Sequence, residues 1–423
     1  MEKGLIIGFD LCRDFCRVSV LEDGRPEAED IPFSEGENPF PVQNALCKKK
    51  GEDVWLIGEE AYQTALFGGG TIVDKLLRLC SMNGKATFEG VTYSAEELLT
   101  IFIRETMKKV FVRKRTNKVR QIVFTLQYLE GRVLDMITRC VRSLGIEKKK
   151  IHIISHTEAY LRYVLAQKKE LWSNMAVLFD LSQEGLNYYE MEILRGQKPN
   201  IARAERTFLE EGFSPDILDS RAGQRMADNI MTNCVERMLS KKLVSAAYLS
   251  GLGMGSCESW GKGFLKVLCQ RRRVFYIDNL FAKGAALAAG DRESGTPSHP
   301  YSLMCEGRID VDISVEMVQG VSRKTLTLAA AGTNWYEIRS AFDFIPDDEK
   351  SLRLTIKKVL DRQEMELEVP FTGFSFPGNK LKRIGAQLSF TSENSFDITL
   401  RDKGFGEFFP SSETTIRHSF EIE

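Results

Sequence analysis

The sequence lacks an excess of charge of either sign, and it lacks long apolar runs. Its 58 lysine and arginine residues almost balance 59 aspartate and glutamate residues, so no global field attracts nucleic acid or an anionic membrane. No apolar run reaches the roughly 20 residues that a bilayer-spanning helix needs. Met1-Glu2-Lys3-Gly4 leads directly into a short apolar segment, which is not a signal-peptide pattern. We therefore expect a cytoplasmic protein that binds neither nucleic acid nor membrane.

Cysteine and histidine are present without any recognisable ligand or disulfide pattern. The nine cysteines include no CxxC pair and are odd in number, which favours a reducing compartment over a disulfide framework. The four histidines show no ligand spacing with a cysteine or carboxylate, so a structural zinc site is not expected. Cys12 and Cys16, four residues apart, are predicted to face the same side of a strand. Buried thiols that pack as small apolar side chains are favoured over a redox or metal role.

A strand–turn–strand pattern occurs twice in the first 290 residues. An apolar strand over 5–11 and a second strand over 15–21 form the first hairpin, and strands over 176–181 and 186–194 form the second. Both first strands end in Phe-Asp-Leu, and strands and helices follow each hairpin. Repetition on this scale predicts two α/β lobes that face each other across a cleft.

Other elements are predicted from periodicity and from turn residues. Ser94 and Glu97 form a capping box for a helix that extends to about Val112. Residues 31–50 are expected to be irregular because prolines interrupt them. The remaining predicted strands cover 54–57, 119–125, 151–154, 246–249 and 274–277, and the remaining predicted helices cover 129–144, 157–167, 221–239, 260–268 and 279–289.

The composition changes after residue 290. A polar, breaker-rich stretch predicts a linker over 293–303. Beyond it, short segments alternate between apolar and polar residues, which is typical of an antiparallel β-sandwich. We therefore expect an α/β domain over 1–292, with lobes 1–174 and 175–292, and a β-sandwich over 304–423. The alternating segments are 309–315, 325–328, 352–356, 364–369, 386–390 and 396–400.

Four motifs occur in the order found in one known superfamily. They are Gly8-Phe9-Asp10-Leu11, Phe179-Asp180-Leu181, Ser250-Gly251-Leu252-Gly253 and Ala282-Lys283-Gly284-Ala285-Ala286. In this order the chain resembles the actin-like ATPase superfamily, and within it the seventy-kilodalton heat-shock (DnaK-type) chaperones. The motifs correspond to that family's first and second phosphate hairpins, its adenosine-binding turn and the helix that connects its lobes. The resemblance implies a duplicated nucleotide-binding fold with two lobes and a cleft.

Shorter stretches extend the resemblance over nearly the whole chain. Residues 55–61 and 93–98 are similar to the upper first lobe of the chaperones, and residues 381–422 are similar to the end of their peptide-binding β-domain. The implied cofactor is ATP or ADP with Mg²⁺, positioned through water by Asp10 and Asp180. The sequence departs from the family in three respects. The upper second lobe is short, the apolar linker is replaced by a polar one, and no helical lid is expected after the β-domain.

The two hairpins carry residues that are poor phosphate ligands. Phosphate hairpins need glycines, whose backbone N–H groups approach the phosphates, and hydroxyl groups that add hydrogen bonds. The first hairpin instead has Cys12-Arg13-Asp14, and the second has Ser182-Gln183-Glu184 followed by Gly185. A carboxylate of Asp14 or Glu184 at about 4 Å from a phosphate would cost roughly 1 kcal/mol in water and about 4 kcal/mol at an effective dielectric constant of 20. The candidate cofactor residues are Asp10, Cys12, Arg13, Asp180, Ser182, Gln183, Gly185, Gly251, Leu252 and Gly253.

No residue is assigned firmly to catalysis. Asp10, Lys75 and Asp180 are candidates, although the spacing of Lys75 differs by one from that of the family's lysine. The family's general-base glutamate aligns with His156, with Glu158 two residues on. A partly buried, hydrogen-bonding histidine is favoured over a catalytic role at position 156. For Asp10 and Asp180 two interpretations remain open, a residual metal–nucleotide site and, slightly favoured, turn-capping residues at strand ends.

Three functional hypotheses follow from these features. The favoured one is a chaperone-like two-domain binding protein, with a weak or inactive ATPase and a β-domain that binds a protein or peptide partner. The alternative is an active ATP-dependent chaperone or ATPase with altered loops. The least favoured is a sugar or metabolite kinase on the same fold. All three depend partly on analogy, because a fold does not carry a function with it.

Overall fold

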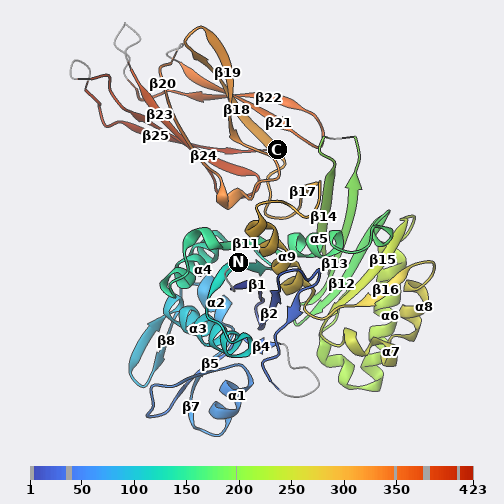
Figure 1. Ribbon diagram of the computed structural model, residues 1–423. Coiled ribbons are helices and arrows are strands. Elements are labelled where there is room, and N and C mark those ends of the chain that lie inside the picture. Colours follow the sequence, from blue (N-terminus) through green and yellow to red (C-terminus); the bar gives the residue numbers. More distant parts are fainter. Residues whose placement is uncertain are drawn as a thin grey trace. The chain divides into compact units, whose positions relative to one another are not determined.

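The computed structural model describes residues 4–34, 41–196, 198–346, 350–374, 382–406 and 410–422 (Figure 1). It divides into two compact units, Met1–Tyr301 and Ser302–Glu423. The first is mixed α/β and the second consists mainly of antiparallel strands. Helix α9 (Leu280–Ser294) continues two residues into the stretch expected to be a linker.

The first sheet is built around the central strands β1 and β10, which are mostly apolar. Strand β1 pairs in parallel with β10, which pairs in parallel with β11, while β2 is antiparallel to β1 and to β3. Every residue of β1 is buried, as expected for a strand covered on both faces. The sheet order is β11 (Ile151–Ser155), β10 (Val119–Leu126), β1 (Leu5–Leu11), β2 (Phe15–Leu21) and β3 (Glu29–Asp30), with β4 (Val42–Gln43) also paired to β2.

The second sheet repeats the strand order and the strand directions of the first. Strand β12 is antiparallel to β13 and parallel to β15, and β13 is antiparallel to β14. The repetition extends to single positions. Asp10 lies one residue before the end of β1, Asp180 lies two residues before the end of β12, and each is the central residue of a Phe-Asp-Leu motif. The order is β16 (Arg273–Tyr276), β15 (Val244–Gly251), β12 (Met175–Ser182), β13 (Gly185–Leu194) and β14 (Ile201–Leu209).

The helices begin and end close to the predicted positions. The capping box of α3 is confirmed, since the Glu97 N–H donates to the Ser94 hydroxyl and the Glu97 carboxylate accepts from the Ser94 N–H. The predicted helix over 260–268 is instead two short helices separated at Gly261. The helices of this unit besides α9 are α3 (Ala95–Lys114), α4 (Gly131–Ser143), α5 (His156–Leu165), α6 (Arg221–Met238), α7 (Cys257–Trp260) and α8 (Lys262–Leu268).

Helix α9 lies against β1 and α5 because two glycines allow close backbone contact. A Cβ atom at Gly8 would lie 2.1 Å from the Ala282 carbonyl oxygen, and one at Gly284 would lie 1.9 Å from that of Ala159. Only glycine permits such approaches. This packing holds the start of α5, where His156 is located, against the carboxyl end of the first sheet (Figure 1).

Small peripheral elements complete the first unit. The prediction that residues 31–50 are irregular is wrong in part, because β4 and β5 form there and β5 is the centre of a three-stranded sheet in the order β6-β5-β7. Strand β4 pairs with the earlier strand β2, and β5 pairs with the later strands β6 and β7; local composition does not show this pairing. The elements are β5 (Leu46–Lys49), β6 (Trp55–Ile57), β7 (Gly70–Val73), β8 (Lys85–Phe88), β9 (Val91–Ser94), α1 (Glu59–Leu66) and α2 (Leu76–Ser81), with 3₁₀ turns at Lys148–Lys150, Lys169–Leu171, Pro215–Asp219 and Met254–Ser256.

The second unit contains two four-stranded antiparallel sheets, in the orders β19-β18-β21-β22 and β20-β23-β24-β25. Side chains alternate between buried and exposed along β18 and β21, as the period-two pattern predicted. Across all the described residues, no helix is long and apolar enough to cross a membrane. The strands are β17 (Ser302–Met304), β18 (Val311–Gln319), β19 (Ser322–Ala329), β20 (Arg339–Phe344), β21 (Ser351–Lys358), β22 (Glu364–Pro370), β23 (Ile384–Phe390), β24 (Ser395–Asp402) and β25 (Thr415–Glu421), with a 3₁₀ turn at Trp335–Glu337.

Candidate functional site

The two hairpins that carry Asp10 and Asp180 meet in the first unit. Asp10 is fully buried and Asp180 is 8% exposed. At the rim, the Arg13 guanidinium of the first hairpin forms an ion pair with Glu184 of the second. The structure therefore brings together the two strand ends that the sequence singled out.

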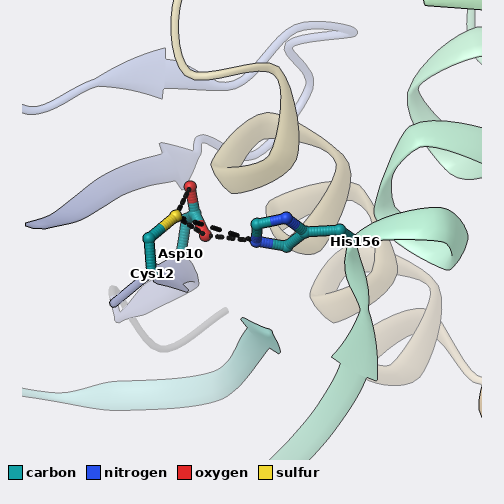
Figure 2. A group of neighbouring side chains, drawn as sticks. All are labelled: Asp10, Cys12 and His156. Atoms are coloured by element: carbon teal, nitrogen blue, oxygen red, sulfur yellow. Dashed lines mark hydrogen bonds and ion pairs between the residues drawn. The ribbon is translucent and has the colours of Figure 1, made fainter. Parts of the chain in front are cut away.

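Two side chains, those of His156 and Cys12, contact the Asp10 carboxylate (Figure 2). Nε2 of His156 lies 2.7 Å from Oδ1 of Asp10. Sγ of Cys12 lies 3.3 and 3.5 Å from the two carboxylate oxygens and 3.9 Å from the same imidazole nitrogen. The His156 ring also stacks on Phe281, with ring centroids 4.0 Å apart. The imidazole is thus fixed by a ring on one face and a carboxylate at its edge.

Local structure explains how these residues converge. Asp10 is the sixth residue of β1, and Cys12 follows that strand directly. His156 is the first residue of α5, which begins directly after β11. The Ser155 hydroxyl caps this helix by accepting from the Glu158 N–H at 3.0 Å. The helix cap therefore fixes the backbone from which the imidazole reaches Asp10.

Burial shifts the acid–base properties of the site. Burial, and next the charge of Asp10, raise the pKa of the Cys12 thiol well above its ordinary value. Burial also raises the pKa of the Asp180 carboxyl, against the nearby charges of His156 and Arg17. At neutral pH the Cys12 thiol is therefore protonated and donates its hydrogen bond to Asp10.

The hairpins use their own polar groups internally. The Cys12 N–H donates to the Phe15 carbonyl at 3.0 Å, and the Asn44 amide donates to the Cys12 carbonyl. In the second hairpin the Ser182 hydroxyl donates to the Gly185 carbonyl at 3.1 Å. These groups stabilise the turns instead of pointing at a phosphate position.

The pocket between the hairpins is small compared with ordinary ligand pockets. The pocket lined by both hairpins, including Cys12, Arg13, Asp180 and Ser182, has a volume of about 20 Å³. One water molecule needs roughly 10–15 Å³ measured in this way, whereas ligand pockets usually have several hundred Å³. A larger cavity of about 950 Å³ lies at the opposite end of β1 and β2. There Arg120 is paired with Asp23 and Glu293 at 2.7 and 2.8 Å.

The turn that resembles an adenosine site is joined to the second hairpin. Gly251 has a φ of +94°, and a Cβ atom there would lie 2.1 Å from the Leu181 carbonyl oxygen. The Leu252 N–H donates to that same carbonyl at 2.8 Å. Gly253 also has positive φ, and its carbonyl accepts from the Trp260 indole at 3.0 Å. These glycines have a packing role within the second lobe.

Some of the predicted residues lie outside the pocket. Lys75 is an exposed residue with φ of 51° at the start of α2. Its charge lowers the pKa of Asp14, while burial and the charge of Glu184 raise that pKa and prevail. Gln183 is exposed and Gly185 packs against the Phe208 ring. Glu158, the alternative base, is buried and paired with Arg162 at 2.8 Å.

Sequence reasoning missed three residues of the pocket and misplaced one. Arg17 is 6% exposed and stands opposite Asp10 across the β1–β2 ladder, and Gln127 and Phe281 also line the pocket. Arg17 is a charged residue within the otherwise mostly apolar strand β2. This pattern in the sequence could have marked it as a candidate site residue. The prediction that Cys12 and Cys16 share a strand is wrong, because Cys12 lies in the turn and only Cys16 lies on β2.

Two family models match the chain. The first is described as the C-terminal part of a family of unknown function (DUF5716), and it matches residues 27–306, more than half of the chain. The chain belongs to this family. The second, a domain of unknown function (DUF8552), matches residues 308–422. No curated protein matches the chain. In this member of the DUF5716 family, the β1–β2 hairpin with Asp10 and Cys12 precedes the matched region.

Proposed function

We propose that this protein is a chaperone-like, two-domain binding protein built on the duplicated actin/heat-shock ATPase fold. In this proposal the first unit is a pseudo-ATPase, and the second unit, a β-sandwich, binds a protein or peptide partner. The observation that carries the proposal is the set of contacts made by the Asp10 carboxylate. Its carboxylate is taken by His156 and Cys12 beside a pocket of about 20 Å³.

The repeated sheet supports the fold part of the proposal. Asp10 is paired with Arg17 and Thr125 on its neighbouring strands, and Asp180 is paired in the same way with Asn187 and Ser250. Matching strand order, strand direction and aspartate position is the arrangement that the resemblance implies for two facing phosphate hairpins.

The chemistry of the hairpins supports loss of hydrolysis. A Mg²⁺–nucleotide complex needs oxygen ligands and hydrogen-bond donors that face the phosphates. Here an imidazole and a thiol lie on Asp10, and the Arg13–Glu184 ion pair joins the hairpins at the rim. Binding ATP would require breaking these contacts and separating the lobes. We infer that the cleft now holds the two lobes together.

A groove in the second unit supports partner binding. It has a volume of about 820 Å³ and is lined by apolar side chains such as Val318, Phe344 and Ile345. Its charged lining consists of four acidic residues and two arginines, so a peptide with alternating basic and apolar residues fits best. The charged residues are Glu316, Asp343, Glu364, Glu366, Arg353 and Arg383.

A measurement of ATP turnover by the purified full-length protein tests whether the first unit is a pseudo-ATPase. We expect no hydrolysis above the level of the Asp10→Asn and Asp180→Asn variants with Mg²⁺ and ATP. Turnover that either substitution abolishes would refute the pseudo-ATPase and favour an active ATPase.

A measurement of peptide affinity tests whether the second unit binds a partner in this groove. An extended fluorescent peptide of alternating lysine and leucine should bind, and Glu364→Lys with Glu366→Lys should weaken binding by about tenfold or more, because two lining charges reverse. Asp361→Lys, in the exposed turn before β22, is the matched control. If the Glu364→Lys, Glu366→Lys variant and the Asp361→Lys control bind the peptide equally well, the groove is not the peptide-binding site.

A further inference from the structure

The three side chains in Figure 2 have the geometry of a metal site. Asp10, Cys12 and His156 each offer one ligand atom, and these atoms lie within 4.8 Å of one another. A tetrahedral Zn²⁺ with usual bond lengths places nitrogen and oxygen about 3.3 Å apart and sulfur about 3.6 Å from either. The observed separations are 2.7 Å for N–O, 3.3 Å for S–O and 3.9 Å for S–N. Each differs from the tetrahedral value by less than about 0.7 Å.

The ligand types select the class of metal. A thiolate and an imidazole are ligands for Zn²⁺ and similar borderline-soft ions, whereas Mg²⁺ prefers oxygen. Burial further favours a bound cation, because Asp10 and the His156 side chain are almost fully buried. Their orientations are fixed by β1, by the α5 cap and by Phe281.

We propose that Asp10, Cys12 and His156 bind one Zn²⁺-class ion, with water as the fourth ligand. The water faces the pocket between the hairpins, whose volume of about 20 Å³ matches one such molecule. Asp180, which also lines that pocket, is a candidate to accept a hydrogen bond from this water. Three protein ligands and one open position are the pattern of reactive rather than purely structural zinc sites.

Charge balance is favourable in the metal-bound state. Binding converts the Cys12 thiol to a thiolate and releases its proton to solvent. The Asp10 carboxylate and this thiolate then neutralise the two charges of the ion, and the imidazole binds through Nε2 in its neutral form. The Asp10–His156 hydrogen bond is replaced by two bonds to the metal.

The site could not be found from local spacing. Residues 10 and 12 are 144 or more positions from residue 156, and only the parallel pairing of β1, β10 and β11 brings them together. His156 has no ligand spacing in the sequence, yet its Nε2 lies 2.7 Å from Oδ1 of Asp10 and 3.9 Å from Sγ of Cys12 in the structure.

Metal binding by the chelator-treated full-length protein tests the proposal. We expect about one Zn²⁺ per chain by isothermal titration. Replacement by Co²⁺ should give the visible d–d bands of a four-coordinate ion and a near-ultraviolet sulfur-to-cobalt charge-transfer band. Cys12→Ser should abolish the charge-transfer band and weaken Zn²⁺ binding by more than about 100-fold, and His156→Gln should weaken binding similarly.

Matched controls separate this site from adventitious binding. Cys269→Ser removes an exposed cysteine of the same unit, and His152→Gln removes a histidine of the strand that precedes α5. Both controls should retain the wild-type stoichiometry and the charge-transfer band. Absence of stoichiometric Zn²⁺ binding, or a band that persists in Cys12→Ser, would overturn the proposal. Circular dichroism of each metal-free variant establishes that it is folded, and the result does not depend on ATP turnover.

Discussion

Asp180 is a buried acid whose position serves the site at a cost in stability. Burial raises the pKa of its carboxyl above the usual 3.8, so the folded state binds this proton more tightly than the unfolded state does. The unfavourable contribution is absent below pH 3.8 and grows as pH rises through the folded-state pKa.

Asp180→Asn should therefore stabilise the protein at pH 7 by about 1 kcal/mol, and the gain should shrink as pH falls toward 4. Thermal denaturation at several pH values measures it. The exposed Asp219→Asn is the control and should change stability by less than about 0.5 kcal/mol. A loss of stability in Asp180→Asn at pH 7 would contradict the account of Asp180.

Single residues show where sequence reasoning succeeded and where it could not. The repeated Phe-Asp-Leu motif located both central strand ends, because strand pattern and motif are local. His156 was expected to be a partly buried, hydrogen-bonding histidine; the structure confirms the hydrogen bond and shows the residue to be 2% exposed. The contact of His156 with Cys12 depends on strand pairing over more than 140 residues, which no local pattern encodes.

At the scale of elements, the contact between α9 and β1 is the most sensitive to substitution. Gly8→Ala would place a methyl group 2.1 Å from the Ala282 carbonyl oxygen and 2.3 Å from the Ala286 nitrogen. Both atoms belong to helix backbone, which cannot move independently of α9. The structure must therefore separate β1 from α9 to accept the methyl group.

Gly8→Ala should lower the free energy of unfolding by about 3 kcal/mol or more, the range of overpacked cores. Gly69→Ala, where the nearest atom would be 3.1 Å away, is the matched control and should cost less than about 1 kcal/mol. Urea denaturation of the full-length protein measures both. Equal stabilities would show that α9 does not pack on β1 as described.

In the second unit, Asp402 organises the segment that follows β24. Burial disfavours its charge, but the Ser412 hydroxyl, the Gly404 and Ser412 N–H groups and the Lys382 ammonium outweigh this and lower its pKa to about 2. The Ser412 hydroxyl and the Lys382 ammonium lie 2.6 and 3.1 Å from the carboxylate. Because the pKa is depressed, the stabilisation is present above pH 3.8 and is lost as pH falls toward 2.

Asp402→Asn should cost about 2 kcal/mol at pH 7 and much less near pH 2, where about half of the wild-type carboxyl groups are protonated. Thermal unfolding followed through the second unit's Trp335 fluorescence, at pH 7 and in steps below pH 4, checks this. The exposed Asp361→Asn is the control. A difference between Asp402→Asn and the wild type that stays constant down to pH 2 would show that the contribution of Asp402 is not ionic.

Most helices and strands were predictable because periodicity and capping are local signals. The strands that were missed lack a strong local sequence signal. Strands β4, β5 and β14 and the edge strand β20 were not predicted. They are short, or they carry exposed polar residues, as in Ile201–Leu209 and Arg339–Phe344. Strands β4 and β20 also pair with strands more distant in sequence, β2 and β23, so composition alone gave no signal for them.

At the scale of the molecule, the two sheets of the first unit repeat one strand order. The contacts between their two hairpins differ from those expected of phosphate-binding hairpins. The aspartates keep matching positions, but Asp10 faces an imidazole and a thiol, and Arg13 and Glu184 join the hairpins. The coarse fold class, a mixed α/β unit followed by antiparallel sheets, was predictable from the order of strand and helix patterns. The filled cleft was not, because it results from side chains of both lobes.

The central claim is that the cleft between the Asp10 and Asp180 hairpins holds no nucleotide. The most direct test is a crystal of the full-length protein soaked with Mg²⁺ and a non-hydrolysable ATP analogue. The account predicts no triphosphate density between the hairpins, with the Asp10–His156 contact and the Arg13–Glu184 ion pair unchanged. A triphosphate bound there, with Mg²⁺ held through water by Asp10 and Asp180, would contradict it.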